Sequence, residues 1–192
     1  LMKSADGYLI RMIVKNGDEL HILTFNPSYL PNRTITGNLE NPYGLIGVYE
    51  RQLPDGILIS DTKNAIIDLD YPVTYAGDFL STSKGGFKLL NTNKYYYQNA
   101  EQYWNDFNKP WLDELVKNKT DIVVLSDKTN ELLKYKWQLD PITNIPIFET
   151  LPGTSIKVKT GFGKEIEFFD NLVEQGIYKW DGVNGVYKYI GN

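Results

Sequence analysis

The sequence contains no cysteine and a single histidine, His21. Enzymes with a cysteine nucleophile, cysteine-rich zinc sites and catalytic sites that need two histidines therefore lack their residues. For the same reason we expect no metal cofactor.

Arginine is also scarce, with three residues among 20 basic side chains, and no run of like charge occurs. The 24 acidic side chains give the chain a net charge of -4. Domains that bind nucleic acid usually carry a basic patch on a basic domain. We therefore expect no nucleic acid partner.

Long hydrophobic runs are absent from the sequence. Apolar stretches such as residues 122–125 end after a few residues, whereas a membrane-spanning helix needs about 20. No signal-peptide pattern opens the sequence. Because the sequence starts at Leu1, we interpret it as part of a longer protein whose export signal would lie upstream.

The composition predicts a chain that folds. Hydrophobic residues make up 42% and charged residues 23% of the 192 residues, which is close to the globular average. No repeat, low-complexity tract or linker divides the sequence, so we predict a single domain over residues 1–192. An alternative division is a β-rich N-terminal part, residues 1–83, and a C-terminal part, residues 84–192.

Two β-hairpins are predicted in the first third of the chain. Residues 8–15 and 19–25 are rich in apolar and β-branched side chains, and they flank Asn16-Gly17, which favours a tight turn. Residues 45–52 and 57–60 flank a Leu-Pro-Asp-Gly sequence, whose proline and glycine are common turn residues.

Two principal helices are predicted further along, at about residues 99–118 and 163–175. In both segments apolar side chains recur every three to four positions, and Asn99 or Asn93 can cap the first helix. Pro110 lies inside the first segment, so we expect a kink or a break near Asn108.

Shorter strands complete the predicted fold. Residues 121–126 predict a buried strand, and residues 132–137 and 145–149 are weaker strand candidates. Residues 178–180 and 186–190 predict a C-terminal hairpin. The predicted fold class is α+β, with antiparallel hairpins near the N-terminus.

One set of short motifs suggests a chemistry. Residues 79–83 contain Ser-Thr-Ser, and a Glu-x-Glu pair, Glu165 and Glu167, follows the Gly-Phe-Gly of residues 161–163. These pieces resemble the motifs of the arginine–serine–glutamate class of ADP-ribosyltransferases. Glu165 and Glu167 are then the candidate catalytic pair.

This resemblance implies NAD as a substrate and a role for each residue. Arg51 or Arg11 would hold the NAD phosphates, since arginine makes bidentate contacts to phosphate. Ser81 would brace the site, with Ser83 beside it as a further NAD contact. Glu167 would stabilise the oxocarbenium ion as nicotinamide leaves.

The helical periodicity of residues 163–174 gives a competing interpretation. In a helix Glu165 and Glu167 point about 200° apart. The Ser-Thr-Ser would then be a turn, and the two glutamates would lie in the first helical turn, where the helix dipole favours acids. The transferase arrangement instead requires residues 161–167 to be an extended loop and strand.

Three other features have weaker functional interpretations. Asp55 and Asp61 resemble a metal-dependent nuclease signature, but an extended chain places them about 20 Å apart, too far to share a magnesium ion. His21 is expected to be structural. A cluster of aromatic side chains predicts either a stacking platform for sugars or bases, or the core side of a helix. The members of this cluster are Tyr95, Tyr96, Tyr97, Tyr103, Trp104, Phe107 and Trp111.

A wider resemblance covers about half of the chain. From residue 84 to residue 180 the sequence is similar to C-terminal modules of large secreted bacterial exoproteins of the filamentous-haemagglutinin and contact-dependent-inhibition type, the polymorphic toxins. Four blocks carry the similarity in order: Lys84-Gly85-Gly86-Phe87 with Leu89-Leu90-Asn91, Tyr103-Trp104-Asn105 with Asn108-Lys109-Pro110-Trp111-Leu112-Asp113, Asp121-Ile122-Val123, and Gly161-Phe162-Gly163-Lys164-Glu165 with Gly176-Ile177-Tyr178.

This similarity implies a toxin that is secreted as part of a larger exoprotein and acts in the cytoplasm of a target cell. A cognate immunity protein would neutralise it in the producing cell. We expect a toxin enzyme that consumes NAD or transfers ADP-ribose. The alternatives are a non-enzymatic carbohydrate- or protein-binding tip of an adhesin and, third, a nuclease of low basicity.

Overall fold

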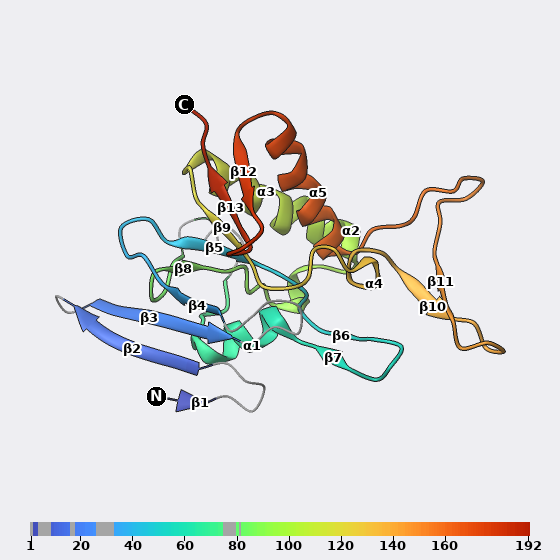
Figure 1. Cartoon of the computed structure of the whole chain (residues 1–192), viewed down its shortest axis with the longest axis horizontal. Helices are drawn as coiled ribbons and strands as arrows, with labels where there is room; N and C mark the ends of the chain where they lie inside the picture. Colours follow the sequence, from blue (N-terminus) through green and yellow to red (C-terminus); the bar gives the residue numbers. More distant parts are fainter. Residues whose placement is uncertain (1, 4–8, 16–17, 26–32, 75–79, 81) are drawn as a thin grey trace.

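A mixed five-stranded sheet forms the centre of the computed structural model, which describes residues 2–3, 9–15, 18–25, 33–74, 80 and 82–192 (Figure 1). The strand order is β12-β13-β9-β5-β8. Strand β5 pairs in parallel with β8 and β9, whereas β13 pairs antiparallel with β9 and β12. The strands are β5 (Tyr43–Ile46), β8 (Phe87–Lys88), β9 (Ile122–Val124), β12 (Tyr178–Asp181) and β13 (Val186–Tyr189).

Helices cover both faces of this sheet. Side chains alternate along a strand, so Leu45 and Val123 enter one core cluster while Ile46 and Ile122 enter the other. Helix α1 (Asp61–Asp68) packs on the first face. Helices α3 (Lys109–Lys117) and α5 (Gly161–Glu174) pack on the opposite face (Figure 1).

The N-terminal sheet confirms the first predicted hairpin. Its antiparallel order is β1-β2-β3-β4, and β2 pairs with β3 along its whole length. The strands are β1 (Met2–Lys3), β2 (Leu9–Lys15), β3 (Asp18–Phe25) and β4 (Arg33–Thr36). The predicted turn, Asn16-Gly17, lies outside the described residues.

Two small hairpins extend from the centre. Strands β6 (Arg51–Gln52) and β7 (Leu58–Ile59) form the second predicted hairpin, but residues 45–46 belong to β5 instead. Strands β10 (Trp137–Leu139) and β11 (Pro146–Phe148) form an arm that projects from the rest of the molecule (Figure 1).

The predicted break in the first helix is confirmed, and it takes the form of a π-helical turn before Pro110. Helix α2 (Ala100–Tyr103) is capped by Asn99, the turn η2 (Trp104–Asn108) follows, and α3 begins at the next residue. Proline lacks an N–H group and its ring clashes with the carbonyl four residues earlier, so Pro110 accounts for the irregular turn before it.

The other helical and strand predictions are mostly confirmed. Helix α5 starts at Gly161, two residues before the predicted start, because the Thr160 side chain accepts a hydrogen bond from the Gly163 N–H. The predicted strand at residues 132–137 is wrong, since Asn130 caps the short helix α4 (Glu131–Lys134) there. A 3-10 turn, η1 (Lys94–Tyr96), precedes α2. The C-terminal hairpin and the α+β class are confirmed.

Within the described ranges, none of the helices combines the length and the apolar character that crossing a bilayer requires.

Arg33 joins the N-terminal sheet to the central sheet. Its side chain is buried, with 7% of its surface exposed. The Nη1 atom donates to the carbonyl oxygen of Val124 at 3.0 Å, and Nη2 donates to that of Gly185 at 2.9 Å. Gly185 has φ of +61°, and a Cβ there would lie 2.7 Å from Nη1, so glycine permits both the turn and the contact.

We predict that Arg33→Met destabilises the protein by about 2–4 kcal/mol, because two buried carbonyl groups lose charged donors. Urea denaturation measures the change. Lys179→Met, at an exposed position on β12, is the matched control and should change stability by less than about 0.5 kcal/mol. Equal stabilities for the two variants would contradict this role of Arg33.

Candidate active site

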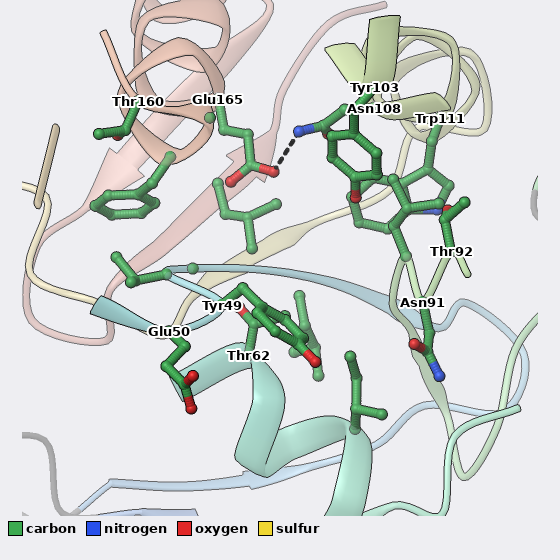
Figure 2. Close-up of a pocket in the computed structure, with 18 of the residues that line it drawn as sticks. Tyr49, Glu50, Thr62, Asn91, Thr92, Tyr103, Asn108, Trp111, Thr160 and Glu165 are labelled. Atoms are coloured by element: carbon green, nitrogen blue, oxygen red, sulfur yellow. Dashed lines mark hydrogen bonds between the residues drawn. The ribbon is translucent and has the colours of Figure 1, made fainter. Parts of the chain in front are cut away.

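A cavity of about 610 Å³ lies at the carboxyl ends of the parallel strands β5 and β8. Residues 47–51 follow β5 and residues 90–94 lie shortly after β8, and both segments line the cavity. Helix α1 contributes Thr62, and the opposite face of the sheet contributes Trp111 from α3 (Figure 2). Open sheets with parallel strands commonly bind ligands at this edge.

The N-terminal part of α5 forms one wall of the cavity. Thr160, Gly161, Phe162 and Glu165 all line it. The Glu165 side chain is 9% exposed and points toward Asn108 (Figure 2). Asn108 is the last residue of the π-helical turn, and its Nδ2 donates to Glu165 Oε1 at 2.9 Å.

Burial sets the protonation of these groups. It raises the pKa of Glu165 to about 8, and the hydrogen bond from Asn108 offsets only part of this effect. The Glu165 carboxyl group is therefore mostly neutral at pH 7. Burial also raises the pKa of Tyr103, with the Glu165 charge as a second cause, so its phenol stays neutral.

Several buried polar atoms at the cavity have no hydrogen-bond partner in the part of the chain that the structure describes. Buried polar groups in folded proteins nearly always find a partner, and exceptions point to water or a ligand. Five such atoms belong to residues that line this cavity: Arg51 Nε, Thr62 Oγ1, Thr92 Oγ1, Asn108 Oδ1 and Glu165 Oε2.

The arrangement suits acid–base chemistry on a small molecule. A carboxyl group with a pKa near ambient pH can both donate and accept a proton. Aromatic rings of Tyr103, Trp111 and Phe162 line the same space, and ligand pockets typically combine such apolar walls with a few polar groups.

The structure brings Arg51 and Glu165 to one cavity. Arg51 Nη2 donates to the carbonyl oxygen of Tyr135 at 3.0 Å, and the guanidinium lies 5.1 Å from the centre of the Trp137 ring. Burial lowers the pKa of Arg51. These contacts fix the guanidinium beside α4 and β10.

Glu167 and Ser83 do not line this cavity. Residues 161–167 form the first two turns of α5, as the periodicity predicts, so the extended segment that the transferase arrangement requires does not form. Glu167 therefore points away from Glu165 and pairs with Lys159 at 2.7 Å. Ser83 is exposed, and Ser81 lies outside the described residues.

The weaker candidates have structural contacts. Asp55 Oδ1 accepts the Ile57 N–H in an exposed turn, and Asp61 accepts a hydrogen bond from Ser126 at 2.7 Å. The His21 ring is buried against Gly85, where a Cβ would come within 2.4 Å of the ring. In the part of the chain that the structure describes, no three His, Asp or Glu side chains form a group that could hold a metal ion.

The aromatic cluster divides between core and surface. Phe107 and Trp111 are buried in the core, whereas Tyr95 is 84% exposed. Asn108, the partner of Glu165, is a functional candidate that sequence reasoning missed. The only signal near it was the helix break before Pro110, since π-helical turns often occur at functional sites.

Comparison of the chain with protein-family models, curated proteins and solved structures gives no match.

We predict that Glu165 makes the protein less stable as the pH rises. The folded protein keeps this proton up to about pH 8, while the unfolded chain loses it near the ordinary pKa of 4.5. The free energy of unfolding should therefore fall between these pH values, by about 1.4 kcal/mol for each unit of pKa difference.

Denaturation of the wild type and of Glu165→Gln from pH 4 to pH 9 tests this prediction. The variant should gain stability relative to the wild type as the pH rises, and the difference should level off above about pH 8. Glu167→Gln, on the exposed side of the same helix, is the control. Parallel curves for the wild type and Glu165→Gln would show that Glu165 keeps an ordinary pKa.

Proposed function

We propose that this chain is an enzyme that acts on a small polar molecule in the cavity, with Glu165 as the group that donates and accepts the proton. The observation that carries the proposal is the gathering of unpaired buried polar atoms at this one cavity. A ligand with several hydrogen-bonding groups would satisfy them.

The surroundings of Glu165 support its role. Asn108 holds one carboxyl oxygen, so the other oxygen, Oε2, is left for the ligand. The apolar wall keeps the carboxyl group neutral until a reaction needs its proton. A positioned general acid or base typically contributes about 10²–10⁴-fold to a rate.

The proposed setting of this activity rests on the sequence. The resemblance to polymorphic toxins supports a secreted toxin module that acts in the cytoplasm of a target cell, with an immunity protein as its partner. NAD remains a candidate substrate, because the transferase-like motifs include Arg51 and Glu165, which both line the cavity. The catalytic carboxyl group in this proposal is Glu165 and not Glu167.

A binding module is the second candidate function. Tyr49 lines the cavity and is 59% exposed, so it could stack against a sugar ring at the cavity mouth. Such a module would bind its ligand without consuming it. Variants of Glu165 separate the two functions.

We predict that inducible expression of the wild-type chain in a bacterium arrests growth and depletes a small metabolite. Glu165→Gln should abolish both effects, because the amide cannot transfer the proton and the rate falls by about 100-fold or more. Growth curves and untargeted metabolite measurements, with NAD among the metabolites quantified, give the readout.

Glu174→Gln is the matched control, since it makes the same change at an exposed position of the same helix and outside the cavity. It should remain as active as the wild type. A folded Glu165→Gln protein with undiminished growth arrest and metabolite depletion would overturn the proposal. Loss of activity in Glu167→Gln alone would favour the transferase arrangement.

A further inference from the structure

A second cleft adjoins the Glu165 cavity. It has a volume of about 890 Å³ and lies between the segment that contains α2 and η2 and the base of the β10–β11 arm. Four residues line both spaces: Tyr97, Tyr103, Asn108 and Gly161. The two spaces therefore meet at the N-terminus of α5.

The second cleft is more basic than the chain as a whole. Four lysines and two glutamates line it, whereas the chain has a net charge of -4. Lys157 and Lys159 form ion pairs with Glu131 and Glu167. Among the described residues, the other two lysines of the cleft, Lys136 and Lys164, have no carboxylate partner; Lys164 lies 5.3 Å from the centre of the Trp104 ring.

The first residues of α5 offer unpaired backbone donors to this junction. The Gly163 N–H is capped by Thr160 Oγ1, and the Lys164 N–H donates to the Thr160 carbonyl oxygen. No hydrogen bond of the described chain uses the N–H groups of Gly161 and Phe162. Together with the helix dipole, such groups favour an anion.

Gly161 has no packing reason to be glycine. A Cβ at Gly161 would meet no atom of the described residues within 4 Å, and the residue has no positive φ. Gly163 differs, because a Cβ there would lie 2.0 Å from the Lys134 carbonyl oxygen. The missing side chain at Gly161 therefore leaves open space beside the N–H groups, where a ligand can approach the backbone.

The same junction contains buried polar atoms that have no hydrogen-bond partner among the described residues. Asn108 is 3% exposed, and within the described ranges neither its Oδ1 nor Glu165 Oε2 has a hydrogen-bond partner. Asn108 borders both spaces, so one ligand can reach these two side chains and the N–H donors of α5 together. One hydroxyl group of a sugar would donate to Asn108 Oδ1, and another would accept the O–H of the neutral Glu165 carboxyl group.

We propose that the substrate is a sugar phosphate or a nucleotide. Its hydroxyl-bearing part lies in the Glu165 cavity, and its phosphate binds in the second cleft at the N–H groups of Gly161 and Phe162, near Lys164 and Lys136. This proposal names the substrate class of the site described above and so rests on the proposed function.

Calorimetric titration of the full chain with two matched pairs of probes tests the proposed phosphate site. One pair is AMP and adenosine, and the other is ribose 5-phosphate and ribose. In at least one pair the phosphorylated member should bind about tenfold or more tightly than the neutral member, since each charge-assisted contact contributes about that factor. Lys164→Met should remove most of this preference.

Gly161→Ala gives the sharpest variant. It should raise the melting temperature of the free protein, because alanine is the better helix former and meets no atom of the chain. It should also weaken binding of the phosphorylated probe by about tenfold, because the methyl group occupies the space of the phosphate. Lys179→Met, on exposed β12, should change neither property.

The proposal would be overturned if neither AMP nor ribose 5-phosphate binds at millimolar concentration. Equal affinity for the phosphorylated and the neutral member of each pair would also overturn it. The same holds if Gly161→Ala and Lys164→Met both bind the phosphorylated probe as tightly as the wild type. Glu165→Gln should bind the phosphorylated probe within a few-fold of the wild type. If Glu165→Gln stays active while the phosphate preference depends on Gly161, the proposed catalytic role fails and the phosphate site stands.

Discussion

The parallel pairing of β5 with both β8 and β9 is the constraint on which the rest of the structure depends. Parallel neighbours need crossover connections, so the chain must leave the sheet and return on each side of β5. Gly44 allows Leu115 of α3 to pack directly on β5, since a Cβ there would lie 2.9 Å from that side chain. The carboxyl ends of the parallel strands β5, β8 and β9 then lie at one edge of the sheet, between α1 on one face and α3 and α5 on the other.

The position of the buried Glu165 follows from the elements that meet at this edge of the sheet. The π-helical turn before Pro110 directs Asn108 toward the start of α5, and Thr160 fixes where α5 begins. Glu165 follows one turn later and enters a space lined by aromatic rings. Its neutral form fits this space, and Oε2, which has no partner among the described residues, is available to the cavity that Glu165 lines.

Local patterns predicted the elements that local interactions determine. The β2–β3 hairpin, α5 and the C-terminal hairpin follow from turn residues, side-chain periodicity and caps. The parallel pairing of β5 did not follow, because β5 and β9 are more than 70 residues apart and each strand is only a few residues long. The prediction of a strand at residues 132–137 was wrong because it did not recognise Asn130 as the cap of helix α4.

The candidate site was predictable only in part. Arg51 and Glu165 were identified from their motif. The motif assigned the main catalytic role to Glu167, but in a helix Glu165 and Glu167 point in different directions, and only Glu165 lines the cavity. Asn108 lies 57 positions from Glu165, and only the tertiary fold brings them together.

The most direct test of the proposed role of Glu165 is the titration of its carboxyl carbon by NMR in the wild-type protein. We expect a midpoint near pH 8; a midpoint near 4.5 would contradict the proposed role of Glu165.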